Sequence, residues 1–138
     1  MILKRMEVEN FRLLKNFELE FKDKLSLIIG KNNCGKTSAL VILDKMLNLS
    51  KIVWEDVNLE RQKELYEKII GPDISKLHDI APFKSITLQL FIEYNDNDSY
   101  ANIQKLMMDL NPDNNIIVLE FVSLISEKKN RRIKKHYK

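Results

Sequence analysis

The sequence has little cysteine, glycine or proline, and it has no long apolar run. Its 138 residues include one Cys, three Gly and three Pro. A single Cys excludes an internal disulfide framework and suits a reducing compartment, so we predict a cytoplasmic protein. The apolar runs are far shorter than the roughly 20 residues of a membrane-spanning helix. The first residues alternate like a strand and do not resemble a signal peptide, so we expect no membrane partner.

Two of the three glycines fall within one stretch of eight residues, Gly30-Lys31-Asn32-Asn33-Cys34-Gly35-Lys36-Thr37. This stretch fits the phosphate-binding loop pattern G-x-x-x-x-G-K-[ST], called the P-loop below. Glycine lets the backbone turn tightly and approach a ligand, while the intervening N–H groups point at phosphates. The pattern predicts that Lys36 binds the β- and γ-phosphates of ATP and that the Thr37 hydroxyl ligates Mg²⁺. The predicted nucleotide-binding residues of this stretch are Gly30, Asn32, Asn33, Cys34, Gly35, Lys36, Thr37 and Ser38.

The flanks of the loop support this interpretation. Residues 25–29 are an apolar run that ends at Gly30, as expected for a buried parallel strand. Residues 37–49 are mostly apolar and contain no Gly or Pro, which predicts a buried helix. Cys34 could be a reactive thiol near a helix N-terminus, but we favour a small neutral filler.

The rest of the chain reads as further strands and helices. Alternation predicts a hairpin of residues 2–10 and 17–21. We interpret Trp54 as an apolar anchor and His78 as a surface or capping residue. The acidic run 95–99 lacks the Gly and Glu of a calcium loop, so we interpret it as a helix N-cap. The later predicted elements are a helix over 55–70, a strand over 85–94, a helix over 100–110 and a strand over 116–126.

Three segments together carry a family resemblance: residues 6–12 with Asn10-Phe11-Arg12, residues 17–21, and residues 27–37 with the P-loop. They resemble the N-terminus of ABC-type ATPases of the RecF/SMC group. The similarity is greatest to the OLD (overcoming lysogenization defect) family of nucleases and related anti-phage ATPases. The resemblance implies that Arg12 lies near the phosphates or the base of the nucleotide. The alternative from the residues alone is a surface Arg on a hairpin turn.

We therefore predict an α/β fold, namely the N-terminal lobe of an ABC-type P-loop NTPase head, with a mixed central sheet and an antiparallel flank. The chain would be the N-terminal part of one ATPase domain in a longer protein. We divide it into a P-loop core (1–49), a helical insert (50–82), a strand-helix-strand flank (83–126) and a basic tail (127–138).

The sequence has no recognisable set of catalytic groups for ATP hydrolysis. ATP hydrolysis needs an acid that holds Mg²⁺ and a group that orients water. The family resemblance implies an apolar strand ending in Asp-Glu, but here Glu120 is followed by Phe121, so we favour a sheet position for Glu120. Gln89 lies within a predicted strand, and we give it no metal role. There is no Leu-Ser-Gly-Gly signature and no acidic nuclease cluster, so the catalytic residues are not identified. The resemblance implies a second ATPase head as a partner.

Charge is concentrated at the end of the sequence. Residues 127–138 hold seven Lys/Arg and one Glu, although the whole chain carries a net charge of only +3. Such a cluster could contact a nucleic-acid backbone, although a solvated strand end or linker is the favoured alternative. We predict Mg-ATP binding, with hydrolysis in the complete protein, in nucleic-acid processing or anti-phage defence alongside a second defence protein. The alternatives are a non-hydrolysing module that docks DNA or a partner and, less favoured, a small kinase or GTPase.

Overall fold

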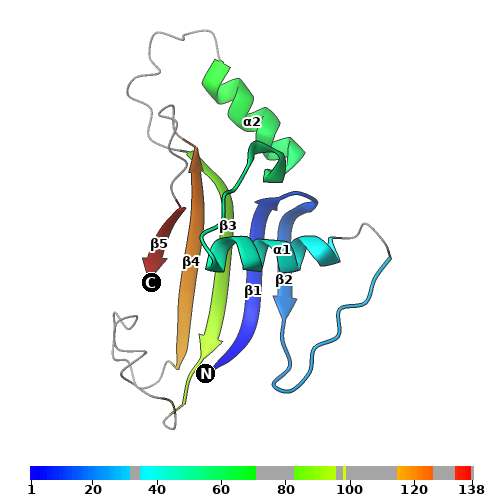
Figure 1. Cartoon of the computed structure of the whole chain (residues 1–138), viewed down its shortest axis with the longest axis vertical. Coiled ribbons are helices and arrows are strands. Elements are labelled where there is room, and N and C mark those ends of the chain that lie inside the picture. Colours follow the sequence, from blue (N-terminus) through cyan, green and yellow to red (C-terminus); the bar gives the residue numbers. More distant parts are fainter. Residues whose placement is uncertain (32–34, 71–82, 96–97, 99–114, 126–132, 138) are drawn as a thin grey trace.

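A computed structural model describes residues 1–31, 35–70, 83–95, 98, 115–125 and 133–137. Its centre is a five-stranded antiparallel sheet with the order β2-β1-β3-β4-β5 (Figure 1). One helix lies across a face of this sheet, and a second helix lies near one end of it (Figure 1). The strands are β1 (Ile2–Phe11), β2 (Leu14–Glu20), β3 (Phe83–Glu93), β4 (Ile116–Ile125) and β5 (Ile133–Tyr137).

The first two strands form the predicted hairpin. β1 and β2 pair antiparallel, with Val8 opposite Phe17 and Phe11 opposite Leu14. Met6 and Val8 are buried, as their alternation with charged residues predicted. The hairpin prediction is therefore confirmed, and its turn begins directly after Phe11.

The later strands extend the hairpin into a sheet. β3 pairs with β1 on one side and with β4 on the other, so segments far apart in sequence lie side by side. Leu88 of β3 faces Phe121 of β4 within the core. The predicted strands over 85–94 and 116–126 are confirmed. β5 was not predicted, because its Lys-rich sequence lacks an apolar alternation and only the pairing with β4 makes it a strand.

The two helices differ in how they are held. α1 (Lys36–Leu47) buries Ala39, Ile42 and Met46 against the sheet, and this spacing places all three on one face. α2 (Leu59–Ile70) follows the short helix η1 (Trp54–Asp56) and anchors itself through Leu65. The helix predicted over 55–70 is thus broken at residues 57–58, where Val57 forms a bridge to Phe11. Trp54 packs against the core, as predicted.

The buried parallel strand predicted at residues 25–29 is wrong for this structure. The segment is extended but belongs to no strand, and it runs outside the sheet on the β2 side (Figure 1). The side chains of Leu25, Leu27 and Ile29 are 77–82% exposed. An apolar run becomes a buried strand only where neighbouring strands pair with it and cover its faces, and no described strand does so.

Several predictions fall on residues that lie outside the described part of the chain. They are the helix over 100–110, His78, most of the acidic run 95–99, and residues 127–132 and 138 of the basic tail. No helix in the described part of the chain is long and apolar enough to cross a membrane.

Candidate nucleotide-binding site

Gly35 begins the second described part of the P-loop and is the N-cap of α1. Its φ of +93° lies in the left-handed region that favours glycine. A Cβ built there would lie 2.6 Å from Leu14 Cδ2, and Leu14 is the first residue of β2. The hairpin turn therefore packs directly against the end of the P-loop.

The P-loop lysine folds back over the start of the loop. Lys36 Nζ donates hydrogen bonds to the carbonyl oxygens of Gly30 and, at 2.7 Å, of Lys31. These contacts bring the described ends of the loop, residues 30–31 and 35–36, around one ammonium group. Next in the chain, Thr37 is exposed and Ser38 is buried. Thr37 is thus an exposed residue in the first turn of α1.

The start of α1 has the electrostatic character of an anion site. Among the described residues, no side chain caps this helix, and its first turn contains no acid. The first N–H groups of a helix lack intrahelical partners and carry a partial positive charge. With Lys36 beside them, these groups fit the phosphates of a nucleotide. Thr37 supplies an oxygen of the kind that Mg²⁺ prefers, so the residues present fit both predicted ligands. Asn32, Asn33 and Cys34 lie outside the described residues.

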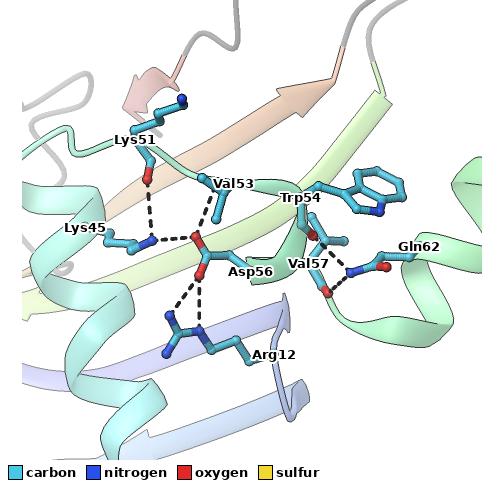
Figure 2. A network of polar contacts seen from close by, with 8 residues as sticks. All are labelled: Arg12, Lys45, Lys51, Val53, Trp54, Asp56, Val57 and Gln62. Carbon is cyan, nitrogen blue, oxygen red and sulfur yellow. Dashed lines mark hydrogen bonds and ion pairs between the residues drawn. The ribbon is translucent and has the colours of Figure 1, made fainter.

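Arg12 lies in a network of polar contacts centred on Asp56 (Figure 2). Arg12 donates from Nε at 3.1 Å and from Nη2 at 2.9 Å to Asp56 Oδ1. Lys45 of α1 donates to Asp56 Oδ2 at 2.5 Å. Arg12 is therefore an exposed residue of the hairpin turn, with 39% of its side chain accessible, and its guanidinium pairs with Asp56. Its predicted contact with nucleotide stays a prediction.

Asp56 is buried and charged. Burial alone raises the pKa of its carboxyl group, but hydrogen bonds from the Lys45 ammonium, the Val53 N–H and the Arg12 guanidinium outweigh this effect, so the pKa lies below its ordinary value. Sequence reasoning missed Asp56, Lys45 and Leu14. The only local sign was a pair of acids between apolar residues in Val53-Trp54-Glu55-Asp56-Val57, which is a weak signal.

The sheet register decides the position of Glu120. Phe121 faces the core beneath α1, and adjacent strand residues point to opposite faces, so Glu120 points away from α1. There Gln89 Nε2 donates to Glu120 Oε1 at 3.2 Å, and Lys84 Nζ lies 3.7 Å from the same oxygen. Glu120 thus occupies a sheet position, as we favoured, and Gln89 is its hydrogen-bond partner there. Within the described ranges, no group of three or more His, Cys, Asp or Glu could hold a metal ion.

Comparisons with known proteins agree with this geometry. The family model for the AAA ATPase domain matches residues 1–138. Endonuclease GajA of Bacillus cereus (strain HuB5-5) is 32% identical over 133 residues, covering 78% of this chain and 19% of the endonuclease. DNA replication and repair protein RecF of Phocaeicola vulgatus is 48% identical over 40 residues, covering 29% of this chain and 11% of RecF. The chain thus spans less than a fifth of the length of either curated relative.

A solved structure extends the comparison to the fold. It comes from work on the ATP-driven dimerization and DNA-stimulated activation of SMC ATPases, and it has a TM-score of 0.59 and 13% sequence identity. The match covers 99% of this chain and 69% of the SMC chain. The resemblance to the RecF/SMC group and the ABC-type head fold are confirmed, while the narrower OLD assignment stays a prediction. The chain belongs to the AAA ATPase domain family and has the fold of an ABC-type, RecF/SMC-like ATPase head.

Proposed function

We propose that this chain binds Mg-ATP through its P-loop. The observation that carries the proposal is the position of Lys36, at an uncapped helix N-terminus and directly against the carbonyls of Gly30 and Lys31. In the bound state the Lys36 ammonium moves from these carbonyls to the β- and γ-phosphates. The Thr37 hydroxyl contacts Mg²⁺, which neutralises charge on the phosphates. N–H groups of the loop bind the remaining phosphate oxygens.

Hydrolysis, in this proposal, requires groups from further polypeptide. An attacking water needs an orienting residue, and Mg²⁺ needs an acid. The acid considered from sequence, Glu120, points away from α1. The apolar segment 25–29 next to the P-loop is largely exposed, as expected of a surface that another segment covers in an assembled ATPase. The 69% coverage of the SMC head is consistent with such an additional segment.

The names of two relatives support a proposal about the process in which the complete protein takes part. One is an endonuclease and another a DNA replication and repair protein. We propose that the complete protein couples ATP to nucleic-acid processing or to anti-phage defence in the cytoplasm. Its partners would be a second ATPase head, a further protein of a defence system, and nucleic acid bound by the basic residues of 127–138.

The proposal is tested by titrating ATP with Mg²⁺ into the chain and into Lys36→Ala. We expect Lys36→Ala to abolish measurable binding, because each hydrogen bond to a charged group contributes about 1.5–3 kcal/mol and more than one is lost. Lys24→Ala is the matched control, since it removes the same charge from an exposed position outside the P-loop. Equal ATP affinity in the wild type and in Lys36→Ala would refute the assignment of the site.

Measuring ATP turnover and DNA binding separates the proposed ATPase head from the alternative, a non-hydrolysing docking module. ATP binding without hydrolysis by this chain agrees with an ATPase head that needs further groups. Hydrolysis that disappears in Lys36→Ala would mean that an acid within the chain completes the site. DNA binding that weakens with salt, without any ATP binding, would favour the docking module, because phosphate contacts release counterions.

A further inference from the structure

One buried carboxylate joins three parts of the structure: the hairpin turn, α1 and the segment before η1. The Asp56 side chain is only 2% exposed. Its Oδ1 accepts from Arg12 in the hairpin turn, and its Oδ2 accepts from Lys45 in α1 and, at 3.1 Å, from the Val53 N–H (Figure 2). Hydrogen bonds to ionised groups are shorter and stronger than those between neutral groups. Asp56 therefore fixes α1 and the hairpin turn relative to one another.

The backbone of the hairpin turn is held by the same segment. Asn10 and Arg12 have φ values of +61° and +50°, which are costly for an arginine in particular. The Arg12 N–H donates to the Asp56 carbonyl at 2.8 Å, and the Asn58 N–H donates to the Asn10 carbonyl at 2.8 Å. Asn58 Nδ2 donates to the Arg12 carbonyl at 2.7 Å. The unusual turn is thus determined by contacts with residues 56–58.

This turn leads directly to the P-loop. Leu14 begins β2 two residues after Arg12, is buried, and lies against Gly35 closely enough to exclude a Cβ there. At the other end of the arrangement, Lys45 belongs to the same helix as Lys36 and Thr37. A rigid helix transmits the position of Lys45 to its N-terminus. Asp56 is therefore connected to the P-loop by two routes. One runs through the hairpin turn and Leu14 to Gly35, and the other runs through Lys45 and α1.

We propose that Asp56 is a positioning residue of the nucleotide site, which sets the backbone at Gly35 and the direction of the α1 N-terminus for the phosphates. This inference rests on the proposed binding of ATP, but it assigns a role to a residue that touches no ligand. Without the Asp56 charge, Lys45 and Arg12 lose their shared anionic partner. The helix and the turn can then shift against each other, and a phosphate cradle tolerates such shifts poorly.

The test measures Mg-ATP affinity of the 138-residue chain by calorimetry, well below its melting temperature. We expect Asp56→Asn to weaken binding about tenfold or more, similar to the loss when a residue that orients a binding group is removed. Asp44→Asn is the matched control, because Asp44 is an exposed acid of α1 whose side chain, among the described residues, accepts a hydrogen bond only from Asn48. It should bind ATP like the wild type.

A role confined to stability predicts a different result. Asp56→Asn would then melt at a lower temperature but bind ATP with unchanged affinity while folded, and this outcome would overturn the proposal. If Asp56→Asn does not fold, Arg12→Gln and Lys45→Gln replace it, because each leaves Asp56 one cation. Wild-type affinity in both of these variants would equally overturn it.

Coupling between the positions gives a second readout. The triple variant combines Asp56→Asn with Arg12→Gln and Lys45→Gln. If Asp56 acts through Arg12 and Lys45, this variant should bind Mg-ATP no more weakly than Asp56→Asn alone. Additive losses would contradict a shared route. Failure of the proposed function is distinguishable, since then the wild type would not bind ATP or Lys36→Ala would bind equally well.

Discussion

Two features of Gly35 disfavour any residue with a side chain at this position: its backbone conformation and its contact with Leu14. Its φ of +93° disfavours any L-residue, and its missing Cβ leaves room for Leu14 Cδ2 at 2.6 Å. We predict that Gly35→Ala destabilises the chain by about 1–3 kcal/mol, the usual cost of a strained backbone residue. It should also abolish Mg-ATP binding, because the loop end moves. Chemical denaturation and calorimetry measure the two effects.

A double substitution separates the two features of Gly35. In Gly35→Ala/Leu14→Ala the clash is removed while the backbone strain remains. We expect this variant to be less destabilised than the sum of the single changes. Simple additivity would show that the contact with Leu14 contributes nothing to the requirement for glycine.

Protonation of Asp56 links stability to pH. Its pKa is lowered in the folded protein relative to the ordinary 3.8, so its stabilising effect is present above that value and is lost as pH falls through the folded pKa. We predict that unfolding experiments below about pH 4 show a steeper loss of stability in the wild type than in Asp56→Asn. At neutral pH the variant should be less stable by about 1–3 kcal/mol, since Arg12 and Lys45 are only partly buried.

The control for this pH effect is again Asp44→Asn, which should follow the wild-type profile. The pKa values of three other carboxyl groups, those of Asp23, Glu64 and Asp98, are also lowered. They are present in all three proteins, so only the difference between the wild type and Asp56→Asn reports Asp56. Parallel profiles of these two proteins would contradict the assigned charge state.

At the level of elements, the segment 25–29 shows what an apolar sequence does without a partner. Leu27 is 77% exposed, so Leu27→Lys should change the free energy of unfolding of the isolated chain by no more than about 0.5 kcal/mol. Solubility should rise, because an exposed apolar row favours association. Leu88→Lys is the control, since Leu88 is fully buried in β3, and it should not fold. Thermal melts measure both.

A large loss of stability in Leu27→Lys would instead show that the segment is buried in solution. Amide hydrogen exchange gives an independent check on the same element. Residues 25–29 should exchange rapidly, while the paired amides of β1 and β3 should be protected. Slow exchange at 25–29 in the chain alone would contradict the exposed arrangement.

At the level of the whole molecule, the proposed partnership with a second ATPase head predicts assembly around nucleotide. The solved structure of similar fold comes from work on the ATP-driven dimerization of SMC ATPases. We expect light scattering to give the mass of a monomer without nucleotide and an increased mass with Mg-ATP. Lys36→Ala should remain monomeric under both conditions. A nucleotide-independent dimer that disappears in Leu27→Lys would point to association through the exposed segment instead.

The sequence by itself determined the local features. The motif at Gly30–Thr37 predicted a phosphate site, the alternation in residues 2–10 and 17–21 gave the hairpin, and the apolar spacing of Ala39, Ile42 and Met46 gave α1. These features depend on residues close in sequence, which is why a linear pattern contains them. The same segments were sufficient to identify the RecF/SMC group.

Only the tertiary structure decided which distant residues meet. The Lys-rich β5 is a strand because it pairs with β4. The register of the sheet places Glu120 on the face away from α1. Residues 25–29 are exposed because no described strand pairs with them. The contact of Asp56 with Arg12 and Lys45 spans 44 and 11 residues of sequence. No local pattern encodes such a contact, because it exists only once the sheet has brought the hairpin turn, η1 and α1 together.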